Sequence, residues 1–186
     1  MGIIRNPIPV KLIIGMLSPD RALFDACSDV LCREYGPIDL QSEVLPWSNT
    51  DYYRDEMGPG IVRKFIIFEH LIDAEALPTI KVLTNSLEKT FAKRSEEEFR
   101  RTINLDPGYV TEAKVVLATT KDFAHRIYIG KGIYAEATLI YSAGSRSFAP
   151  VAHTYPDYRT DAGRSLFNAA RTLLRKQLNK DRPRKR

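Results

Sequence analysis

The apolar and polar residues of this chain follow two different periods, and each period predicts a type of secondary structure. Residues 10–17 form a short, continuous apolar run, which is typical of a strand buried on both faces. Ser18, Pro19 and Asp20 then supply an N-cap, a first-turn proline and a first-turn acid, so a helix is predicted to begin here and to end at Gly36. The apolar stripe of this helix consists of Leu23, Cys27, Val30 and Leu31.

Two more strands and a second helix follow in the pattern. Strands are predicted at residues 38–47 and 61–70, joined by a polar loop, and a helix capped by Asp73 comes next. A fourth strand is expected around residues 101–105. The apolar residues of the second helix recur at helical spacing, and they are Leu77, Ile80, Leu83, Leu87 and Phe91.

The resulting order of strand, helix, strand, strand, helix and strand is the split βαβ arrangement of ferredoxin-like folds. Directly after it, Asp106, Pro107, Gly108 and Tyr109 predict a tight turn, because proline fixes one φ and glycine supplies a positive φ. Residues 111–120 are compatible with a short helix or a strand, since their apolar core is too short for periodicity to decide.

The last third of the chain adds a hairpin and a helix. Residues 125–130 and 133–141 alternate on both sides of Lys131 and Gly132, which predicts an antiparallel hairpin, and a further strand is expected near 148–152. The final amphipathic helix has the apolar residues Leu166, Ala170, Leu173, Leu174 and Leu178. The sequence therefore predicts an α+β fold, with a ferredoxin-like βαββαβ core, an added antiparallel hairpin and a C-terminal helix.

Length and charge limit the number of domains. With 186 residues, 44% of them hydrophobic, the chain can bury one sizeable core and does not need two. Its formal net charge of +5 comes from the end of the chain, where seven basic residues lie between positions 175 and 186. We predict one domain at residues 1–178 and a basic, disordered tail at 179–186. The tail could contact nucleic-acid phosphates weakly or be a solvated terminus, and we favour the second.

Cysteine usage and hydropathy predict a cytoplasmic protein without membrane contact. Cys27 and Cys32 fall on different sides of one predicted helix, so no disulfide is expected. They lack CxxC spacing, and His70, His125 and His153 lack the spacing of metal ligands, so no metal site is predicted. No signal peptide and no stretch of about 18 uncharged apolar residues occurs. The sequence identifies no cofactor and does not fix the oligomeric state.

Polar residues gather in the block 101–109. Asn104 and Asp106 at the end of a buried strand could direct a carboxylate at a ligand or a metal, with Arg101 holding a phosphate and Tyr109 stacking on a ring. The alternative, which the turn pattern favours, is that Asn104 and Asp106 hydrogen-bond the backbone of the turn. Asp106 is thus a candidate catalytic residue, and Arg101, Asn104 and Tyr109 are candidate ligand-binding residues.

A second polar block, 121–126, contains Lys121, His125 and Arg126. Lys121 and Arg126 are candidate ligand-binding residues that could hold a phosphate, and His125 is a candidate catalytic residue that could accept a proton. The alternative, which we favour, is a solvated loop before a strand. The third catalytic candidate, Glu136, lies between small apolar neighbours and could point into a polar cleft, although pairing with Arg126 across the hairpin is the favoured role.

Two further loops carry aromatic residues that could stack on a planar ligand. One is residues 47–58, and the other is residues 154–158, where Tyr155 and Asp157 are candidate ligand-binding residues. The alternatives are that the aromatic side chains fill the core and that Asp157 caps the last helix.

Several enzyme classes lack their motifs in this chain. It contains no GxxxxGK[ST] phosphate loop, no GxSxG nucleophile elbow and no HExxH zinc helix. A guanine-reading TKxD element is also missing, because Asp122 follows Lys121 directly. A P-loop NTPase is therefore not expected.

The amino-acid sequence of several segments, NLDPGY, HRIYIGKGIYAEATL and TYPDY, resembles that of an uncharacterised bacterial family, a domain of unknown function of about this length. The similarity covers nearly the whole chain apart from the basic tail. Some members of that family are labelled GTP-binding proteins. The resemblance implies a stand-alone prokaryotic protein and transfers no catalytic residue.

Three functions fit these observations, in descending order. The first is a binder of, or small enzyme acting on, a phosphorylated ligand or nucleotide, which requires the polar candidates to converge in one pocket. The second is a nucleic-acid-binding accessory domain whose sheet aromatics stack on bases and whose tail adds affinity. The third is a non-catalytic interaction or oligomerisation module that offers the hairpin around Lys131 as a sheet edge.

Overall fold

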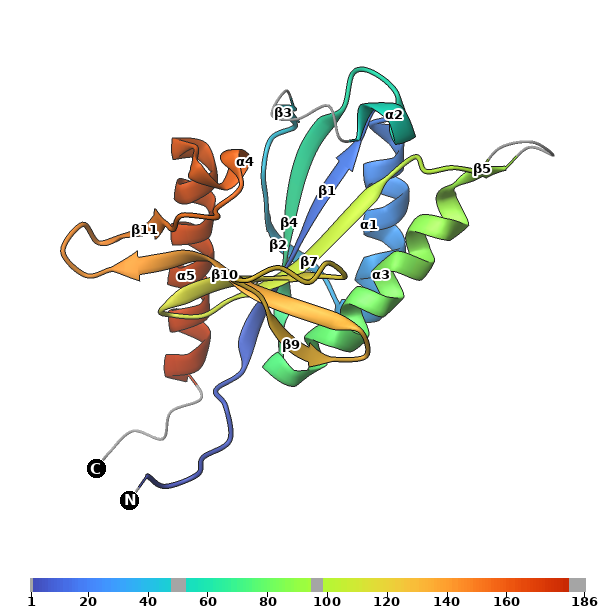
Figure 1. Cartoon of the computed structure of the whole chain (residues 1–186). Helices are drawn as coiled ribbons and strands as arrows, with labels where there is room; N and C mark the ends of the chain where they lie inside the picture. The colour runs from blue at the N-terminus through green and yellow to red at the C-terminus, as the bar shows by residue number, and fades with distance from the viewer. Residues whose placement is uncertain (1, 48–52, 95–98, 181–186) are drawn as a thin grey trace.

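The structure is a computed structural model that describes residues 2–47, 53–94 and 99–180. An antiparallel sheet runs through the molecule, and helices pack on both of its sides (Figure 1). The helices are α1 (Ala22–Tyr35), α2 (Arg54–Met57), the 3-10 turn η1 (Ala74–Ala76), α3 (Leu77–Phe91), α4 (Pro156–Arg159) and α5 (Asp161–Lys180). The strands are β1 (Val10–Ser18), β2 (Ile38–Gln41), β3 (Leu45–Pro46), β4 (Val62–Ile72), β5 (Lys93–Arg94), β6 (Phe99–Arg100), β7 (Asn104–Val110), β8 (Lys114–Thr119), β9 (Ile127–Gly130), β10 (Ile133–Ser142) and β11 (Ser147–Pro150).

The strands of the main sheet follow the order β11-β10-β8-β7-β1-β4-β2, with β3 added beside β4 and β9 beside β10. The continuously apolar strand β1 is central and fully buried, and it pairs with β4 on one side and β7 on the other. β5 and β6 form a separate pair. The chain is thus a mixed α and β protein, in which the sheet positions everything else.

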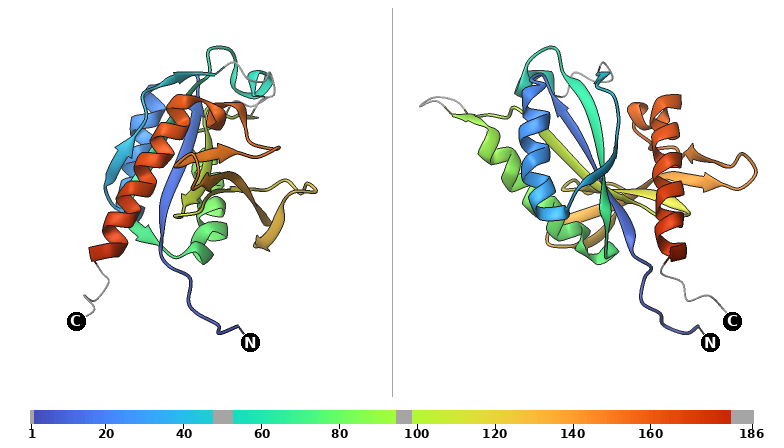
Figure 2. Two further views of the ribbon diagram at one scale, coloured as in Figure 1. Left: turned by 90° about the vertical axis from the view of Figure 1, so that its left-hand side faces the viewer. Right: turned by 180° about the vertical axis from the view of Figure 1, so that it is seen from behind.

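The two faces of the sheet belong to different helical layers. On one face, Leu12 packs in a core with Phe24 of α1 and Ile80 of α3. On the other, Ile13 packs in a second core with Phe167 of α5. Figure 2 shows α1 and α3 on one side of the sheet and α5 on the opposite side. In the described part of the chain, no helix is long and apolar enough to cross a membrane.

Most of the predicted elements are present. The structure confirms the strand at 10–17, the helices α3 and α5, and the hairpin of β9 and β10, where Lys131 (φ 56°) and Gly132 (φ 73°) form the turn. The first predicted helix is also present as α1, but it begins at Ala22, and the predicted N-cap Ser18 is the last residue of β1. The predicted strand at 38–47 is divided into β2 and β3, the strand expected at 101–105 begins only at Asn104, and residues 111–120 contain a strand, β8. Helix α5 includes the first two residues of the predicted tail, whose remainder, 181–186, lies outside the described residues.

The tight turn predicted at residues 106–109 is wrong, because these residues lie inside β7 and pair with β1. Gly108 serves a close approach of strands, since a Cβ atom there would lie 2.3 Å from the carbonyl oxygen of Val116 in β8. Pro107 is tolerated because β8 pairs with β7 only from Gly108 onward, so the missing N–H falls where β7 has no neighbouring strand on that side.

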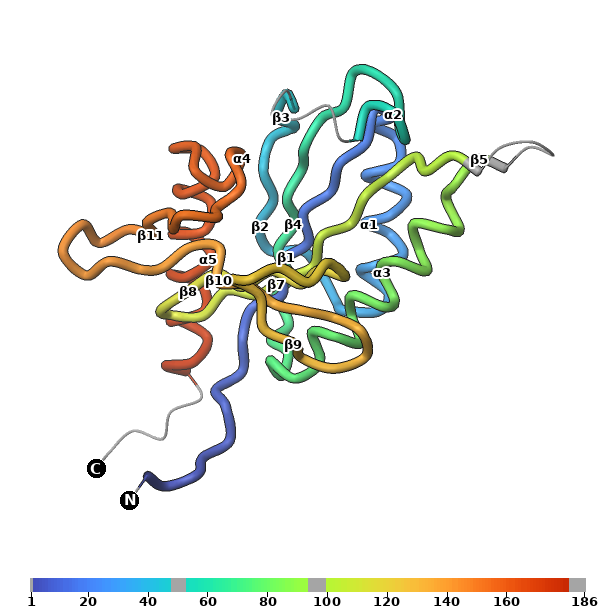
Figure 3. Tube along the Cα trace, in the orientation of Figure 1, coloured from blue at the N-terminus to red at the C-terminus, as the bar shows by residue number. Residues whose placement is uncertain are grey.

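Both ends of the described chain leave the body at the same end of the molecule. Residues 2–9 extend away from the body before β1 begins, and α5 finishes nearby (Figure 3). The split between β7 and β8 lies away from both ends, and it is here that polar side chains gather.

Candidate functional site

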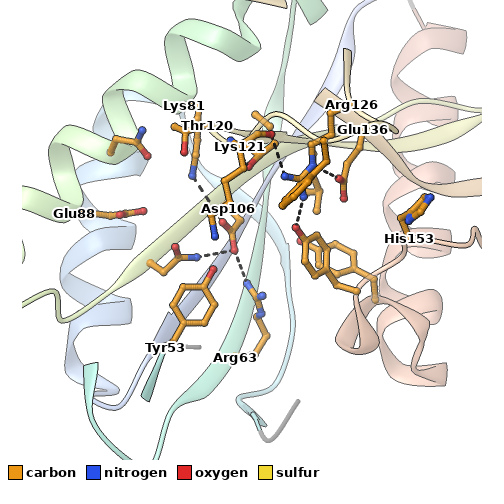
Figure 4. Close-up of a pocket in the computed structure, with 18 of the residues that line it drawn as sticks. Tyr53, Arg63, Lys81, Glu88, Asp106, Thr120, Lys121, Arg126, Glu136 and His153 are labelled. Atoms are coloured by element: carbon orange, nitrogen blue, oxygen red, sulfur yellow. Dashed lines mark hydrogen bonds and ion pairs between the residues drawn. The ribbon is translucent and has the colours of Figure 1, made fainter. Parts of the chain in front are cut away.

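A pocket of about 630 Å³ opens where the sheet splits between β7 and β8. β8 pairs with β7 only through residues 115–117, opposite residues 108–110. The first half of β7 therefore has no strand on that side. Side chains from α3, from the loop after β8, from β10 and from the segment before α4 surround the gap (Figure 4).

Two side chains of α3 replace the missing neighbour of β7. Glu88 Oε1 accepts a hydrogen bond of 2.7 Å from the backbone N–H of Leu105, and Lys81 Nζ donates a hydrogen bond of 2.7 Å to the carbonyl oxygen of Leu105. Buried backbone groups require such partners. These bonds explain why two charged residues lie buried on α3, and they place both side chains in the pocket wall.

Asp106 lies at the centre of the pocket floor. Its Oδ2 accepts hydrogen bonds from Asn104 Nδ2 at 2.7 Å and from Arg63 Nη1 at 3.3 Å, and its Oδ1 lies 3.8 Å from Lys81 Nζ (Figure 4). Burial alone would raise the pKa of Asp106, but Lys81, Arg63 and the hydrogen bond from Asn104 outweigh it and lower the pKa. Asp106 is therefore an ionised carboxylate at neutral pH.

Arg63 of β4 connects this floor to α4. Its side chain is buried, its Nε lies 2.8 Å from Asp157 Oδ2, and its guanidinium lies 5.0 Å from the ring centre of Trp47. Burial opposes the charged form, but the carboxylates of Asp157 and Asp106 outweigh it and raise the pKa of Arg63. Arg63 is therefore a permanently charged cation in the pocket floor, and Asp157 stabilises that charge from behind.

Arg101 closes the floor on the side of α2. Its Nη2 lies 2.5 Å from Glu56 Oε2, and its Nη1 lies 3.4 Å from both Glu88 Oε2 and Asn104 Oδ1. Its guanidinium also lies 5.2 Å from the ring centre of Tyr53. Burial raises the pKa of Glu88 in spite of the neighbouring cations. Glu88 therefore binds a proton more readily than an exposed glutamate does.

A second cluster forms the rim of the pocket around Glu136 in β10. Its buried Oε2 accepts a hydrogen bond from Arg126 Nε at 2.7 Å and lies 3.0 Å from His125 Nε2. Arg126 also donates to the carbonyl oxygen of Lys121 at 3.0 Å and to the hydroxyl of Tyr155 at 2.9 Å. Arg126 thus joins β10 to the loop after β8 and to the segment before α4.

His125 stacks with two other rings on this rim. Its ring centre lies 3.9 Å from that of His153, with the planes 8° apart, and 6.2 Å from that of Phe123, with the planes 6° apart. A carboxylate that pairs with Arg126 accepts hydrogen bonds only, so the contact with Glu136 favours the tautomer of His125 that has its proton on Nε2 and leaves Nδ1 as the acceptor. His125 can accept a proton at Nδ1.

The structure brings most of the predicted candidates together. Tyr109 is an exception, because it packs in a separate apolar cluster and does not line this pocket. Asp157 lies behind Arg63 and is not in the pocket wall. The candidates that line the pocket are Arg101, Asn104, Asp106, Lys121, His125, Arg126, Glu136 and Tyr155.

The structure also decides some of the alternative roles that the sequence left open for polar and aromatic residues. Asn104 and Asp106 do not hydrogen-bond a turn backbone, because no turn exists there and Asn104 donates to Asp106 instead. Glu136 pairs with Arg126, as predicted, and also lines the pocket. In the loop 47–58, Trp47 and Tyr53 line the pocket, whereas residues 48–52 lie outside the described residues.

Several pocket residues escaped the sequence analysis. Lys81, Asn85 and Glu88 recur at i, i+4 and i+7 along α3, so a polar stripe beside the apolar one was the available signal. Arg63 lies just before the apolar run of β4, but the adjacent Lys64 is charged as well, so the sequence did not mark Arg63 as the buried residue. His153 was considered in the sequence only as a metal ligand, and only folding brings its ring beside His125.

The pocket offers cations and hydrogen-bonding groups rather than metal ligands. Its carboxylates are occupied by cations, as in the pairs of Asp106 with Arg63 and of Glu136 with Arg126. Within the described ranges, no group of three or more His, Cys, Asp or Glu residues is arranged to hold a metal ion. The arrangement suits an anionic, polar ligand.

Fold and site together define an α and β protein with a charged pocket, of the size of a small ligand, at a split in an antiparallel sheet. The chain belongs to the family described as "Domain of unknown function (DUF4416)", whose model matches residues 8–173. This match confirms the resemblance to an uncharacterised family and spans every element that lines the pocket. A comparison with the curated proteins found no match. A comparison with the solved structures found none either.

Proposed function

We propose that this pocket binds a phosphorylated small molecule of about the size of a nucleotide and that His125 transfers a proton to or from it. The observation that carries the proposal is the meeting of residues 101–106, residues 121–126, Glu136 and Tyr155 around one cavity. The cavity volume of about 630 Å³ falls within the range of about 300–1,000 Å³ that ligand sites occupy. Residues that served only turns and strand faces would not need to converge in this way.

The distribution of charge favours the rim as the place for the phosphate. The rim holds two cations and one carboxylate, with two histidines beside them: Lys121, Arg126, Glu136, His125 and His153. The floor holds equal numbers of cations and carboxylates: Arg63, Lys81, Arg101, Glu56, Glu88 and Asp106. Positive charge therefore exceeds negative charge at the rim, and arginine and lysine are the usual phosphate-binding side chains.

The geometry of His125 supports a role in proton transfer at this rim. In the hydrolysis of a phosphate ester, the oxygen of a water molecule bonds to phosphorus and His125 Nδ1 takes one proton of that water. The bond from phosphorus to the alcohol oxygen breaks, and the departing oxygen takes a proton from solvent water to leave as the alcohol. Glu136 orients the ring through Nε2 and stabilises the imidazolium that forms. Arg126 and Lys121 stabilise the charge on the phosphate oxygens.

Thermal unfolding with added ligands tests the binding step. The ligands are inorganic phosphate, ribose 5-phosphate and nucleoside monophosphates, and at about 100 times its dissociation constant a ligand adds roughly 2.7 kcal/mol, or about 5–10 °C, to the stability of a protein of this size. Lys121→Ala should reduce the shift. Lys114→Ala, which changes an exposed lysine outside the pocket, should not. The proposal fails if no phosphorylated compound shifts the transition or if both variants respond like the parent protein.

Release of inorganic phosphate from the same esters tests the chemical step. His125→Gln and Glu136→Gln are expected to lower the initial rate by about 100-fold, the usual contribution of a general base. His70→Gln provides a matched control, because His70 lies outside the pocket. Binding by the parent protein without any release of phosphate would remove the catalytic role from His125 and leave a binding protein.

We also propose that β1, α1, β2, β4, α3 and β7 form a ferredoxin-like core. The strand order β7-β1-β4-β2 supports this, because each of the two helices connects a pair of strands with one antiparallel strand inserted between them. The packing of α1 and α3 in one core is a second support. A crystal structure with a different order of these four strands would contradict the proposal.

A further inference from the structure

One carboxylate oxygen on the pocket floor has hydrogen-bonding capacity to spare. Both hydrogen bonds to Asp106, from Asn104 and Arg63, end on Oδ2. Lys81 Nζ lies 3.8 Å from Oδ1, which is beyond hydrogen-bond distance, and no other described residue donates to Oδ1. An ionised carboxylate has about four acceptor sites, and this side chain, which lines the pocket, is 24% exposed. Oδ1 of Asp106 can therefore accept hydrogen bonds from a ligand.

Asn85 supplies a second available group on the same floor. It lies on α3 between Lys81 and Glu88 and lines the same pocket. Its two neighbours are bonded to the backbone of Leu105, whereas the amide of Asn85 makes no hydrogen bond with any residue in the described ranges. An amide offers two donors and one acceptor oxygen. Asn85 and Asp106 thus present complementary groups to whatever occupies the floor.

The charges of the floor already have partners within the protein. Arg63 pairs with Asp157 and Asp106, and Arg101 pairs with Glu56 and Glu88. A charged group of the ligand would have to replace one of these ion pairs, which leaves the displaced charge unpaired in a mostly buried place. An uncharged group with hydrogen-bond donors meets no such obstacle.

We infer that Asp106 and Asn85 select the end of the ligand that is remote from the phosphate, and that this end is uncharged and presents O–H or N–H donors to Asp106 Oδ1. The inference rests on the proposed function, in which the rim takes the phosphate. The substrate class is therefore a phosphate monoester of a donor-rich alcohol. Both the hydroxyls of a sugar and the N–H edge of a nucleobase supply this chemistry.

Calorimetric titration of the full chain separates the two ends of the ligand. The probes are inorganic phosphate, ethyl phosphate, ribose 5-phosphate and inosine 5′-monophosphate. At least one donor-bearing ester is expected to bind about tenfold more tightly than ethyl phosphate, because hydrogen bonds to a charged group contribute on this scale. Tight binding of ribose 5-phosphate assigns the sugar hydroxyls as donors, and tight binding of inosine 5′-monophosphate alone assigns the base edge.

Two variants then assign the selectivity to residues. Asp106→Asn is expected to reduce the preference for the donor-bearing esters over ethyl phosphate about tenfold, and Asn85→Ala is expected to reduce it about threefold. Asn85→Ala keeps the test decisive if Asp106→Asn fails to fold, since Asn85 has no hydrogen bond to any described residue. Asn179→Ala on the exposed last turn of α5 is the matched control.

Two different failures can be told apart in this experiment. If the parent protein binds phosphate but does not prefer donor-bearing esters, or if the variants weaken all four probes equally, the inference is overturned and the rim site stands. If none of the four probes binds, the proposed function is overturned, and the inference falls with it.

Discussion

Arg63 on β4 reaches across the central strand β1 to Asp106 on β7, and its Nη1 lies 3.3 Å from Asp106 Oδ2. The crossing point is Gly15, which pairs with Phe65 on one side and with Asp106 on the other. A Cβ atom at Gly15 would lie 2.8 Å from Arg63 Nη1 and 3.2 Å from the hydroxyl of Tyr158. The glycine of the central strand thus leaves the space in which the pocket floor is assembled.

The first prediction concerns this space. Gly15→Ala should reduce the free energy of unfolding by about 1–3 kcal/mol, because the added methyl group overpacks a buried site and moves the guanidinium of Arg63 away from Asp106 and Asp157. Urea unfolding measures the change. In an Asp106→Asn background the loss should be smaller, since part of the interaction is already gone. Losses that simply add would show that Gly15 acts independently of the ion pair.

The second prediction uses the lowered pKa of Asp106. A carboxyl group with a lower pKa in the folded than in the unfolded chain stabilises the fold above its unfolded value of about 3.9, and this contribution is lost as the pH falls through the folded value. Asp106→Asn should therefore cost about 1–3 kcal/mol at pH 7 and progressively less below about pH 4. Urea unfolding over this pH range is the measurement. A difference that grows on acidification would contradict the ionised state of Asp106.

The third prediction has the opposite sign. Burial raises the pKa of Glu88 in the folded protein above its value in the unfolded chain. As the pH rises from about 4.3, the unfolded chain loses this proton first, so the stability of the fold decreases until the pH passes the pKa of the folded state. Glu88→Gln lacks this titration. The free energy of unfolding of the variant minus that of the parent should therefore be larger at pH 7 than at pH 4, so the variant gains stability relative to the parent as the pH rises. A relative stability that stays constant or declines with pH in chemical unfolding would refute this assignment.

The fourth prediction distinguishes the strand at residues 106–109 from the turn that the local sequence suggests. In the strand, an alanine Cβ at Gly108 would lie 2.3 Å from the carbonyl oxygen of Val116, so Gly108→Ala should cost at least about 2 kcal/mol and disturb the pairing of β7 with β8. Gly144→Ala is the control, because the nearest atom would be 3.8 Å away, and a change within about 0.5 kcal/mol is expected. Equal effects of the two substitutions would argue against the paired strand.

Much of the secondary structure could be predicted because its cause is local. The apolar run at 10–17 predicts a strand that needs burial on both faces, and β1 has this burial. Lys131 and Gly132 predict a hairpin turn between alternating segments, and both residues have the positive φ that such a turn requires. These signals depend on neighbours in the sequence and not on distant parts of the chain.

The error at residues 106–109 shows where local signals fail. Proline followed by glycine favours a turn in an isolated segment, but here the pairing of β7 with β1 keeps the backbone extended. Pro107 needs no hydrogen-bond acceptor at an unpaired edge, and Gly108 is required by the approach of β8. The same two residues thus serve a different purpose once the neighbouring strands are present.

By itself, the sequence determined the main helices and strands, the mixed α and β class and a set of polar blocks, because periodicity and turn chemistry act over a few residues. Only the tertiary structure decided which polar side chains meet. Lys81 and Leu105 are 24 positions apart, and Arg63 and Asp106 are 43 apart, yet each pair is in contact. The order of strands in the sheet and the split between β7 and β8 bring these pairs together, and both depend on long-range packing that no local pattern encodes.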